Sequence, residues 1–287
     1  MRYRYQVAGA VFSSVALVLT GLAGPAFAKG GNDPPQKNVI YSSAVNKPGN
    51  LPSVGAEAYA FKEFGNQVNF AGTNRKLNSV VVTLSSWGCA TGRWNTGDCV
   101  TPDNATFAMP MTLNIYNAPA AGSSVPGSLI ASLTQSYKIP YRPSASKKCV
   151  GAAAGEWYDR NLKTCFNGLA TDITFEFNNT TVPDSVVYGI AYNTTHYGYS
   201  PIGEAAACFT SSGGCGYDAL NIGLSSTDPS AGSNTNPGTV FQNSPIGGQY
   251  CDSGTAGANT FRLDSPGKAC WAPYIPAVEF KASRGRN

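Results

Sequence analysis

The sequence predicts an all-β protein: a two-sheet antiparallel β-sandwich, jelly-roll-like, with long disulfide-stapled loops. Three observations predict this fold. Apolar and polar residues alternate with a period of two in several short runs, which is typical of half-buried antiparallel strands. The 287 residues include 32 Gly and 19 Pro, which favour many turns. An even number of Cys residues, eight, lies in the segments between the runs.

The alternating runs follow one another along the chain, and no window of about twelve residues shows a helical stripe. In the run 77–85, Val80, Val82 and Leu84 fall on one face, with Ser and Thr opposite. The other clear runs are 109–116, 172–177, 186–192, 219–225 and 278–280, and further candidates are 56–61, 66–71 and 129–138. About ten strands are therefore expected, forming two packed sheets.

The N-terminal residues have the pattern of a secretory signal peptide. Arg2 and Arg4 precede a mostly apolar run at 7–22, and Ala26-Phe27-Ala28 is a small-x-small cleavage site. An uncleaved membrane anchor is the alternative, but the run is short and contains Ser, Thr and Gly. We expect a signal peptide at 1–28, a flexible leader at 29–38, a single β-sandwich domain at 39–281 and a basic tail at 282–287. The expected product is secreted and extracellular, with no membrane insertion after cleavage.

Charge argues against a nucleic-acid partner. Only 13% of the residues are charged, and the formal net charge of +4 falls to +2 when Arg2 and Arg4 are removed with the signal. A charge this small does not indicate a nucleic acid or an acidic membrane as partner.

The Cys residues fall into four pairs of close neighbours in sequence. In an exported chain they predict four disulfides, each closing one loop. The expected bonds are Cys89–Cys99, Cys149–Cys165, Cys208–Cys215 and Cys251–Cys270. Zinc binding is the rival interpretation, but the chain has no C-x-x-C and one His.

Three segments resemble a known group of proteins. They are LNSVVVTLSSWGC at 77–89, MTLNIYNAPAAGSSVPGSLIASLTQSY at 111–137 and ITFEFNNTTVPDSVVYGIAYNT at 173–194. Their strands and turns resemble secreted bacterial β-sandwich ectodomains of jelly-roll type, many without an assigned function. The resemblance covers about residues 56–225 and includes no catalytic motif. It implies the fold, and only weakly a glycan-binding or cell-surface role, since a fold hosts many functions.

Catalytic and metal-binding signals are sparse. His196, the one histidine, could act as a general base, but no G-x-S-x-G elbow accompanies it. The carboxylate pairs Glu156/Asp159 and Asp98/Asp103 are the alternative, since a glycosidase uses two such groups. No cofactor is expected. A structural Ca²⁺ held by loop oxygens is conceivable, and the sequence does not place it.

Aromatic residues in polar loops are the strongest indication of a ligand. Rings on disulfide-bonded loops, beside polar side chains, could stack on sugar faces. The alternative is that each ring packs against its own cystine or the sandwich end. The candidate binding residues are Arg93, Trp94, Trp157, Tyr158, Tyr197 and Tyr199.

These features favour a secreted, non-catalytic binding module or cell-surface or matrix protein. The expected partner is an extracellular polysaccharide or cell-wall polymer. Two alternatives stay open: an extracellular hydrolase or lyase acting on a polymer, and a structural coat protein that self-associates.

Overall fold

The computed structural model describes residues 38–46, 51–56, 61–94, 96–192, 220–244, 260–264 and 271–284. Contacts divide the chain after Pro35, and all described residues belong to the unit Gln36–Asn287. The predicted signal peptide at 1–28 and the leader up to residue 37 lie outside the described residues. In the described part of the chain, no helix is long and apolar enough to cross a membrane.

The first sheet is built around its longest inner strand, β4 (Lys76–Ser86). This strand pairs along one side with β9 (Leu169–Thr181), and along the other with β16 (Val278–Ser283) and then β11 (Leu220–Ser225). Its remaining strands are β1 (Val39–Ser42), which pairs with β16, and β2 (Ser53–Val54) and β15 (Ile275–Pro276), which pair with β11. Every pairing is antiparallel, as the alternation predicts.

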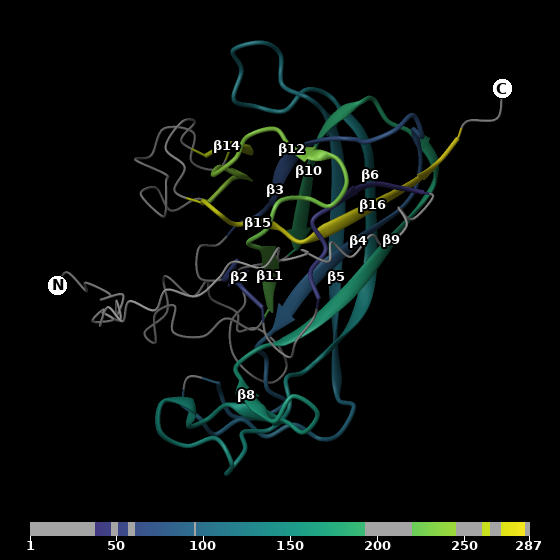
Figure 1. The fold of residues 1–287 in the computed structure, drawn as a ribbon. Helices are drawn as coiled ribbons and strands as arrows, with labels where there is room; N and C mark the ends of the chain where they lie inside the picture. The colour runs from purple at the N-terminus through teal and green to yellow at the C-terminus, as the bar shows by residue number, and fades with distance from the viewer. Residues whose placement is uncertain are drawn as a thin grey trace, which may run out of the picture. The chain divides into compact units, whose positions relative to one another are not determined.

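The second sheet is also antiparallel and has β10 (Ser185–Tyr192) inside it. Its order is β14 (Arg262–Leu263), β13 (Phe241–Gln242), β3 (Phe64–Asn69), β10, β5 (Thr106–Asn117) and β6 (Leu129–Pro140), with β12 (Ser233–Asn234) paired to β3. Successive strands mostly change sheet: the chain passes from β3 to β4, to the β5–β6 hairpin, to β9, to β10 and to β11 (Figure 1). The two-sheet antiparallel sandwich predicted from the sequence is confirmed.

The core lies between the two sheets and is formed by the residues that the alternation assigns inward. Rings from opposite sheets meet there, as Tyr188 of β10 and Phe280 of β16 do at 5.4 Å between centroids. The predicted inward residues are all buried: Val80, Val82, Leu84, Met109, Met111, Leu113, Ile115, Ile173, Phe175, Phe177, Val186, Tyr188, Ile190, Tyr192, Leu220, Ile222, Leu224, Val278 and Phe280. The period-two pattern therefore identified the core face of each of these strands.

Strand bounds differ from the expectations mainly at their ends. The run 129–138 is β6, the run 66–71 corresponds to β3, and residues 57–60 of the run 56–61 lie outside the described residues. Strand β16 continues through Ser283, and its Ala282 is buried opposite Leu77. Two residues expected in the basic tail thus belong to the sheet.

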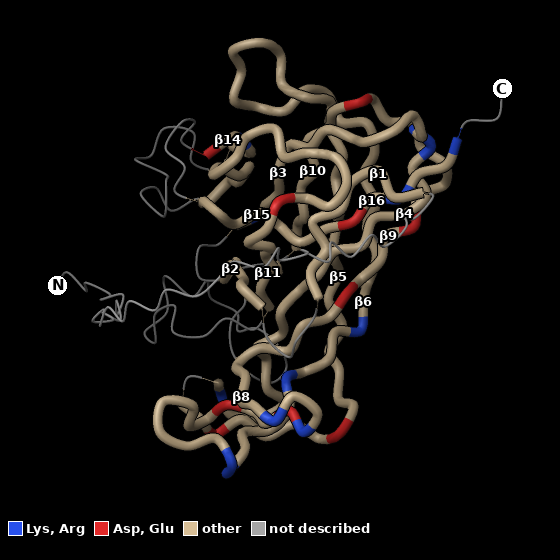
Figure 2. The backbone as a smooth tube through the Cα atoms, viewed as in Figure 1, with Lys and Arg blue, Asp and Glu red and all other residues tan. Residues whose placement is uncertain are grey.

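Two long loops leave the same end of the sheets, because β4 and β6 end there and β5 and β9 begin there. We call residues 87–105 and 141–168 together the loop lobe. It carries the two-stranded sheet of β7 (Trp157–Asp159) and β8 (Thr164–Phe166) and a short 3₁₀ turn, Gly151–Ala153. The label β8 marks the lobe in Figure 1, and Figure 2 shows both basic and acidic residues there. The lobe also carries six Lys and Arg residues and four Asp and Glu residues.

Candidate functional site in the loop lobe

Each loop of the lobe is closed by a disulfide. Cys89 bonds Cys99 and Cys149 bonds Cys165, with Cα atoms 5.4 and 5.9 Å apart. Both pairings were predicted from the spacing and are confirmed. The other four Cys residues of the predicted pairs, Cys208, Cys215, Cys251 and Cys270, lie outside the described residues. Disulfides are typical of proteins in oxidising environments.

Hydrogen bonds join the two loops, although about 40 residues separate them in sequence. The Ser144 hydroxyl accepts from the Thr101 amide at 2.9 Å and donates to the Thr101 carbonyl at 3.1 Å. The Ala145 amide donates to the Cys99 carbonyl at 2.9 Å. These bonds hold the segments 101–105 and 143–146 beside each other, and both contribute to the cavity described below.

A fully buried Arg142 also holds the lobe together. Its Nη2 donates to the Gly155 carbonyl at 2.6 Å, and its amide donates to the Gly88 carbonyl at 2.9 Å. Gly155 has a positive φ of 89°, and a Cβ there would come within 2.7 Å of the Gly97 Cα. The two loops therefore touch at a glycine contact that side chains would push apart.

The lobe has its own small aromatic core. The rings of Trp87 and Trp94 meet edge to face, with centroids 4.6 Å apart. Trp157 packs against Phe166, and its Nε1 donates to the Gly168 carbonyl at 3.0 Å. A side chain at Gly168 would collide with the Trp87 ring, so glycine permits this packing.

Two of the predicted binding residues, Trp94 and Trp157, belong to this aromatic core. Trp157 is only 6% exposed, and Trp94 is half-buried against Trp87. Arg93 is half-buried in the 89–99 loop, where its amide donates to the Asp98 carboxylate at 2.8 Å. Tyr197 and Tyr199 lie outside the described residues, as does the weak catalytic candidate His196.

Tyr158 has the opposite orientation to Trp157, because neighbouring residues of a strand point to opposite faces. Trp157 faces the lobe core, and Tyr158 lines a cavity of about 500 Å³ where the lobe meets the strand ends. The charged, amide and aromatic side chains on its walls are those of Asp103, Asn104, Tyr141, Lys148, Tyr158 and Arg160. Cavities of this size are typical of small-molecule sites.

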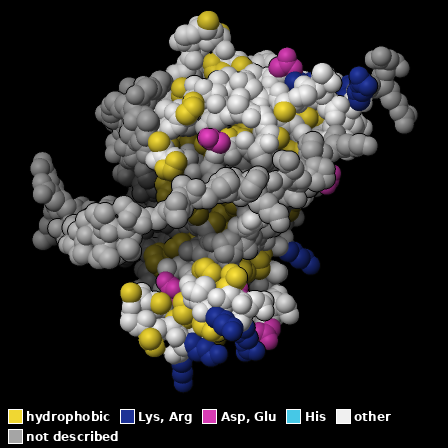
Figure 3. Space-filling view, in the orientation of Figure 1, with side chains coloured by type: hydrophobic (Ala, Val, Ile, Leu, Met, Phe, Trp, Pro, Cys, Tyr) yellow, Lys and Arg dark blue, Asp and Glu magenta, His cyan; other side chains and the backbone are white. Residues whose placement is uncertain are grey.

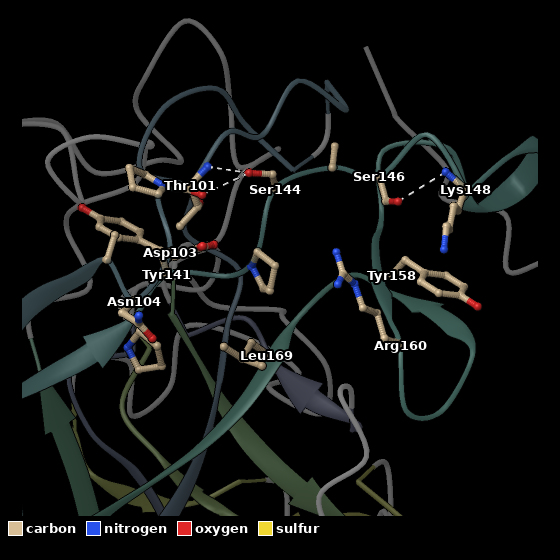
Figure 4. A pocket seen from close by; sticks show the side chains of 15 residues that line it. Thr101, Asp103, Asn104, Tyr141, Ser144, Ser146, Lys148, Tyr158, Arg160 and Leu169 are labelled. Carbon is tan, nitrogen blue, oxygen red and sulfur yellow. Dashed lines mark hydrogen bonds between the residues drawn. The ribbon is translucent and has the colours of Figure 1, made fainter.

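Figure 4 shows how these side chains lie. Asp103, Asn104 and Tyr141 line one side, and Lys148, Tyr158 and Arg160 line the other. The Lys148 ammonium lies 4.7 Å from the centroid of the Tyr158 ring, a cation–π contact. Tyr141 packs against Phe107 of β5, with centroids 4.9 Å apart, so one wall is anchored on the sandwich.

Two of the four carboxylates of the lobe accept hydrogen bonds within its own turns. Asp98 accepts from the Thr96 hydroxyl at 2.6 Å, and this hydrogen bond, with that from the Arg93 amide, lowers the pKa of Asp98. Asp159 accepts from the amides of Asn161 and Leu162. The pairs Glu156/Asp159 and Asp98/Asp103 thus include carboxylates that stabilise turns. Within the described residues, no group of three His, Cys, Asp or Glu side chains is placed to hold a metal ion.

Sequence reasoning missed Tyr141, Lys148 and Arg160, and named Tyr158 together with Trp157. The alternation within 157–159 could have separated the two rings, but no sequence pattern shows that a segment near residue 103 lies across from residue 160.

Comparison with protein-family models, with curated proteins and with solved structures finds no match to this chain. The fold and the loop-lobe cavity are therefore the basis of any functional conclusion.

Proposed function

We propose that the protein is a secreted, non-catalytic binding module that recognises an extracellular polysaccharide in the loop-lobe cavity. The observation that carries this proposal is the cavity itself. It joins two tyrosine rings, Tyr141 and Tyr158, to polar side chains such as Asp103 and Asn104. Rings of this kind stack on the apolar faces of sugars, and polar groups beside them orient the hydroxyls.

The construction of the site supports binding without a large rearrangement. Two disulfides and the Thr101–Ser144 hydrogen bonds hold the walls before a ligand arrives. Preorganised walls reduce the entropy cost of binding. Asp103, Asn104, Lys148 and Arg160 are exposed, so the cavity opens to solvent.

A pull-down of the full, oxidised chain with insoluble polysaccharides and cell walls tests the proposal. We expect retention that falls about tenfold in Tyr158→Ala, since contacts between aromatic rings are worth about 0.5–1.5 kcal/mol beyond the area that they bury. The matched control is Tyr274→Ala, an exposed tyrosine outside the cavity.

If Tyr158→Ala is retained as well as the parent, the proposed binding site is wrong, although the protein would still be a polysaccharide-binding module. Failure to bind any polysaccharide would contradict the function. Released reducing ends in the same assay would instead favour the hydrolase alternative, and a size that grows with concentration would favour self-association.

A further inference from the structure

The charges around the loop-lobe cavity are distributed unevenly. Arg160 and Lys148 are both exposed and lie on the same side of the cavity (Figure 4). Neither forms an ion pair with another described residue. Lysine and arginine side chains gather on the surface of the lobe in Figure 3.

The carboxylates nearest in sequence form no ion pair with Arg160 or Lys148. Asp159, next to Arg160, accepts the Asn161 amide at 2.8 Å and the Leu162 amide at 3.0 Å. Glu156 accepts the Asn167 side-chain amide at 3.0 Å. Asp103 lines the cavity, but on the opposite side (Figure 4). One side of the cavity therefore carries two cations that form no ion pair with any described residue, while the opposite side carries the Asp103 carboxylate.

A guanidinium that forms no ion pair, as Arg160 forms none with a described residue, is suited to an oxyanion such as a carboxylate or a phosphate. Its planar fork donates two parallel hydrogen bonds to a carboxylate, a stronger and more specific contact than a neutral sugar hydroxyl offers. The Lys148 ammonium, over the Tyr158 ring, places a second cation directly beside an aromatic surface. The wall thus offers positive charge and an apolar ring at neighbouring positions.

We propose that the cavity binds an acidic polysaccharide, whose uronic-acid unit places its carboxylate against Arg160 and Lys148 and its sugar ring against the part of the Tyr158 ring that Lys148 does not cover. This inference rests on the proposed function and specifies its ligand. A uronic acid carries a carboxylate on the same ring that stacks, which matches the wall. Asp103 and Asn104, across the cavity, are placed to receive the hydroxyl groups of that unit.

Binding of the full, oxidised chain to three polymers tests the ligand class. Polygalacturonate has the sugar and the charge, its fully methyl-esterified form keeps the sugar without the charge, and polyglutamate has the charge without the sugar. We expect polygalacturonate to bind at least about tenfold more tightly than either of the others, because only it satisfies both parts of the wall.

Single substitutions then test whether the carboxylate of the ligand binds at Arg160. Arg160→Gln is expected to weaken polygalacturonate binding about tenfold. The matched control is Lys147→Gln, which removes the same charge from an exposed residue outside the cavity and should change binding less than about twofold. Near-ultraviolet circular dichroism of each variant verifies that the lobe is folded.

The outcomes separate the two proposals. Equal binding of polygalacturonate and its ester, with loss in Tyr158→Ala, overturns the acidic ligand and keeps the polysaccharide function. Equal binding of polyglutamate, or equal weakening by Arg160→Gln and Lys147→Gln, shows general charge attraction and overturns the inference. If no polysaccharide binds, the proposed function fails together with it.

Discussion

Glu63 is an unusual residue for the outer surface of a sandwich. It lies just before β3, and it is only 8% exposed. Its Oε1 accepts from Asn114 Nδ2 at 3.0 Å and from the Tyr116 hydroxyl at 2.9 Å, both on β5. The carboxylate lies against Gly189 of β10, where a Cβ would collide with it. Burial raises the pKa of Glu63 above its ordinary 4.5, and the two hydrogen bonds only partly oppose the rise.

Replacing Glu63 by Gln tests this balance. Because the folded-state pKa is raised, protonated Glu63 stabilises the fold below about pH 4.5, and that contribution is lost as the pH rises through the folded-state pKa. Glu63→Gln does not titrate and keeps an acceptor oxygen for Asn114 and Tyr116. We expect it to be more stable than the parent at about pH 8, with a smaller difference at about pH 4, in urea unfolding.

The matched control for this prediction is Glu176→Gln on β9, since Glu176 is exposed. Because it changes only an exposed side chain, it should alter the free energy of unfolding by less than about 0.5 kcal/mol. A Glu63→Gln variant that is less stable than the parent at about pH 8 would show that the buried charge stabilises the fold.

Among the structural elements, the loop lobe differs from the two large sheets in the interactions that stabilise it. Its strands β7 and β8 have three residues each and form a sheet of their own. An isolated two-stranded hairpin is marginally stable in water. The aromatic packing of Trp157 and the Cys149–Cys165 bond, which spans 16 residues, provide the additional support.

Removing that disulfide should therefore loosen the lobe selectively. A loop of this length is stabilised by about 3 kcal/mol, so the double variant Cys149→Ala/Cys165→Ala should speed amide hydrogen exchange in β7 and β8 about 100-fold. Exchange in β5 and β10 should change little. The control is Val150→Ala, since Val150 is 75% exposed in the same loop. Equal acceleration in the sheets would mean that lobe and sandwich unfold together.

At the scale of the whole described unit, residues far apart in sequence close the sandwich. The first strand β1 pairs with the last strand β16. Tyr188 of β10 packs between the sheets against Phe280 of β16, where burial raises its pKa well above 10.0. Its hydroxyl has no hydrogen-bond partner among the described residues, and such a buried group costs about 1–3 kcal/mol.

Tyr188→Phe should therefore raise the free energy of unfolding by about 1 kcal/mol, because it removes the unpaired hydroxyl and keeps the ring. Tyr192→Phe on the same strand is the matched contrast. The Tyr192 hydroxyl donates to the Leu220 carbonyl at 2.7 Å, so its loss should lower stability by about 1 kcal/mol. Chemical unfolding measures both, and a loss of stability in Tyr188→Phe would show that its hydroxyl is hydrogen-bonded.

The order of the residues along the chain was enough to predict the class of the fold, the core face of each main strand and two of the disulfides. Alternation is a local property, since the position of Val80 or Leu113 on a strand decides which face it occupies. The spacing of 10 and 16 residues likewise made each disulfide a property of one loop.

Tertiary structure alone decided which strands are neighbours and which loop side chains form the candidate site. Trp94 packs against Trp87, Trp157 donates to the Gly168 carbonyl, and the bond between Ser144 and Thr101 holds two segments of the cavity wall together. Loops have no repeating backbone geometry that orients their side chains. Contacts with distant segments orient them instead, so Arg160 and Asp103 face one cavity for reasons that no local pattern contains.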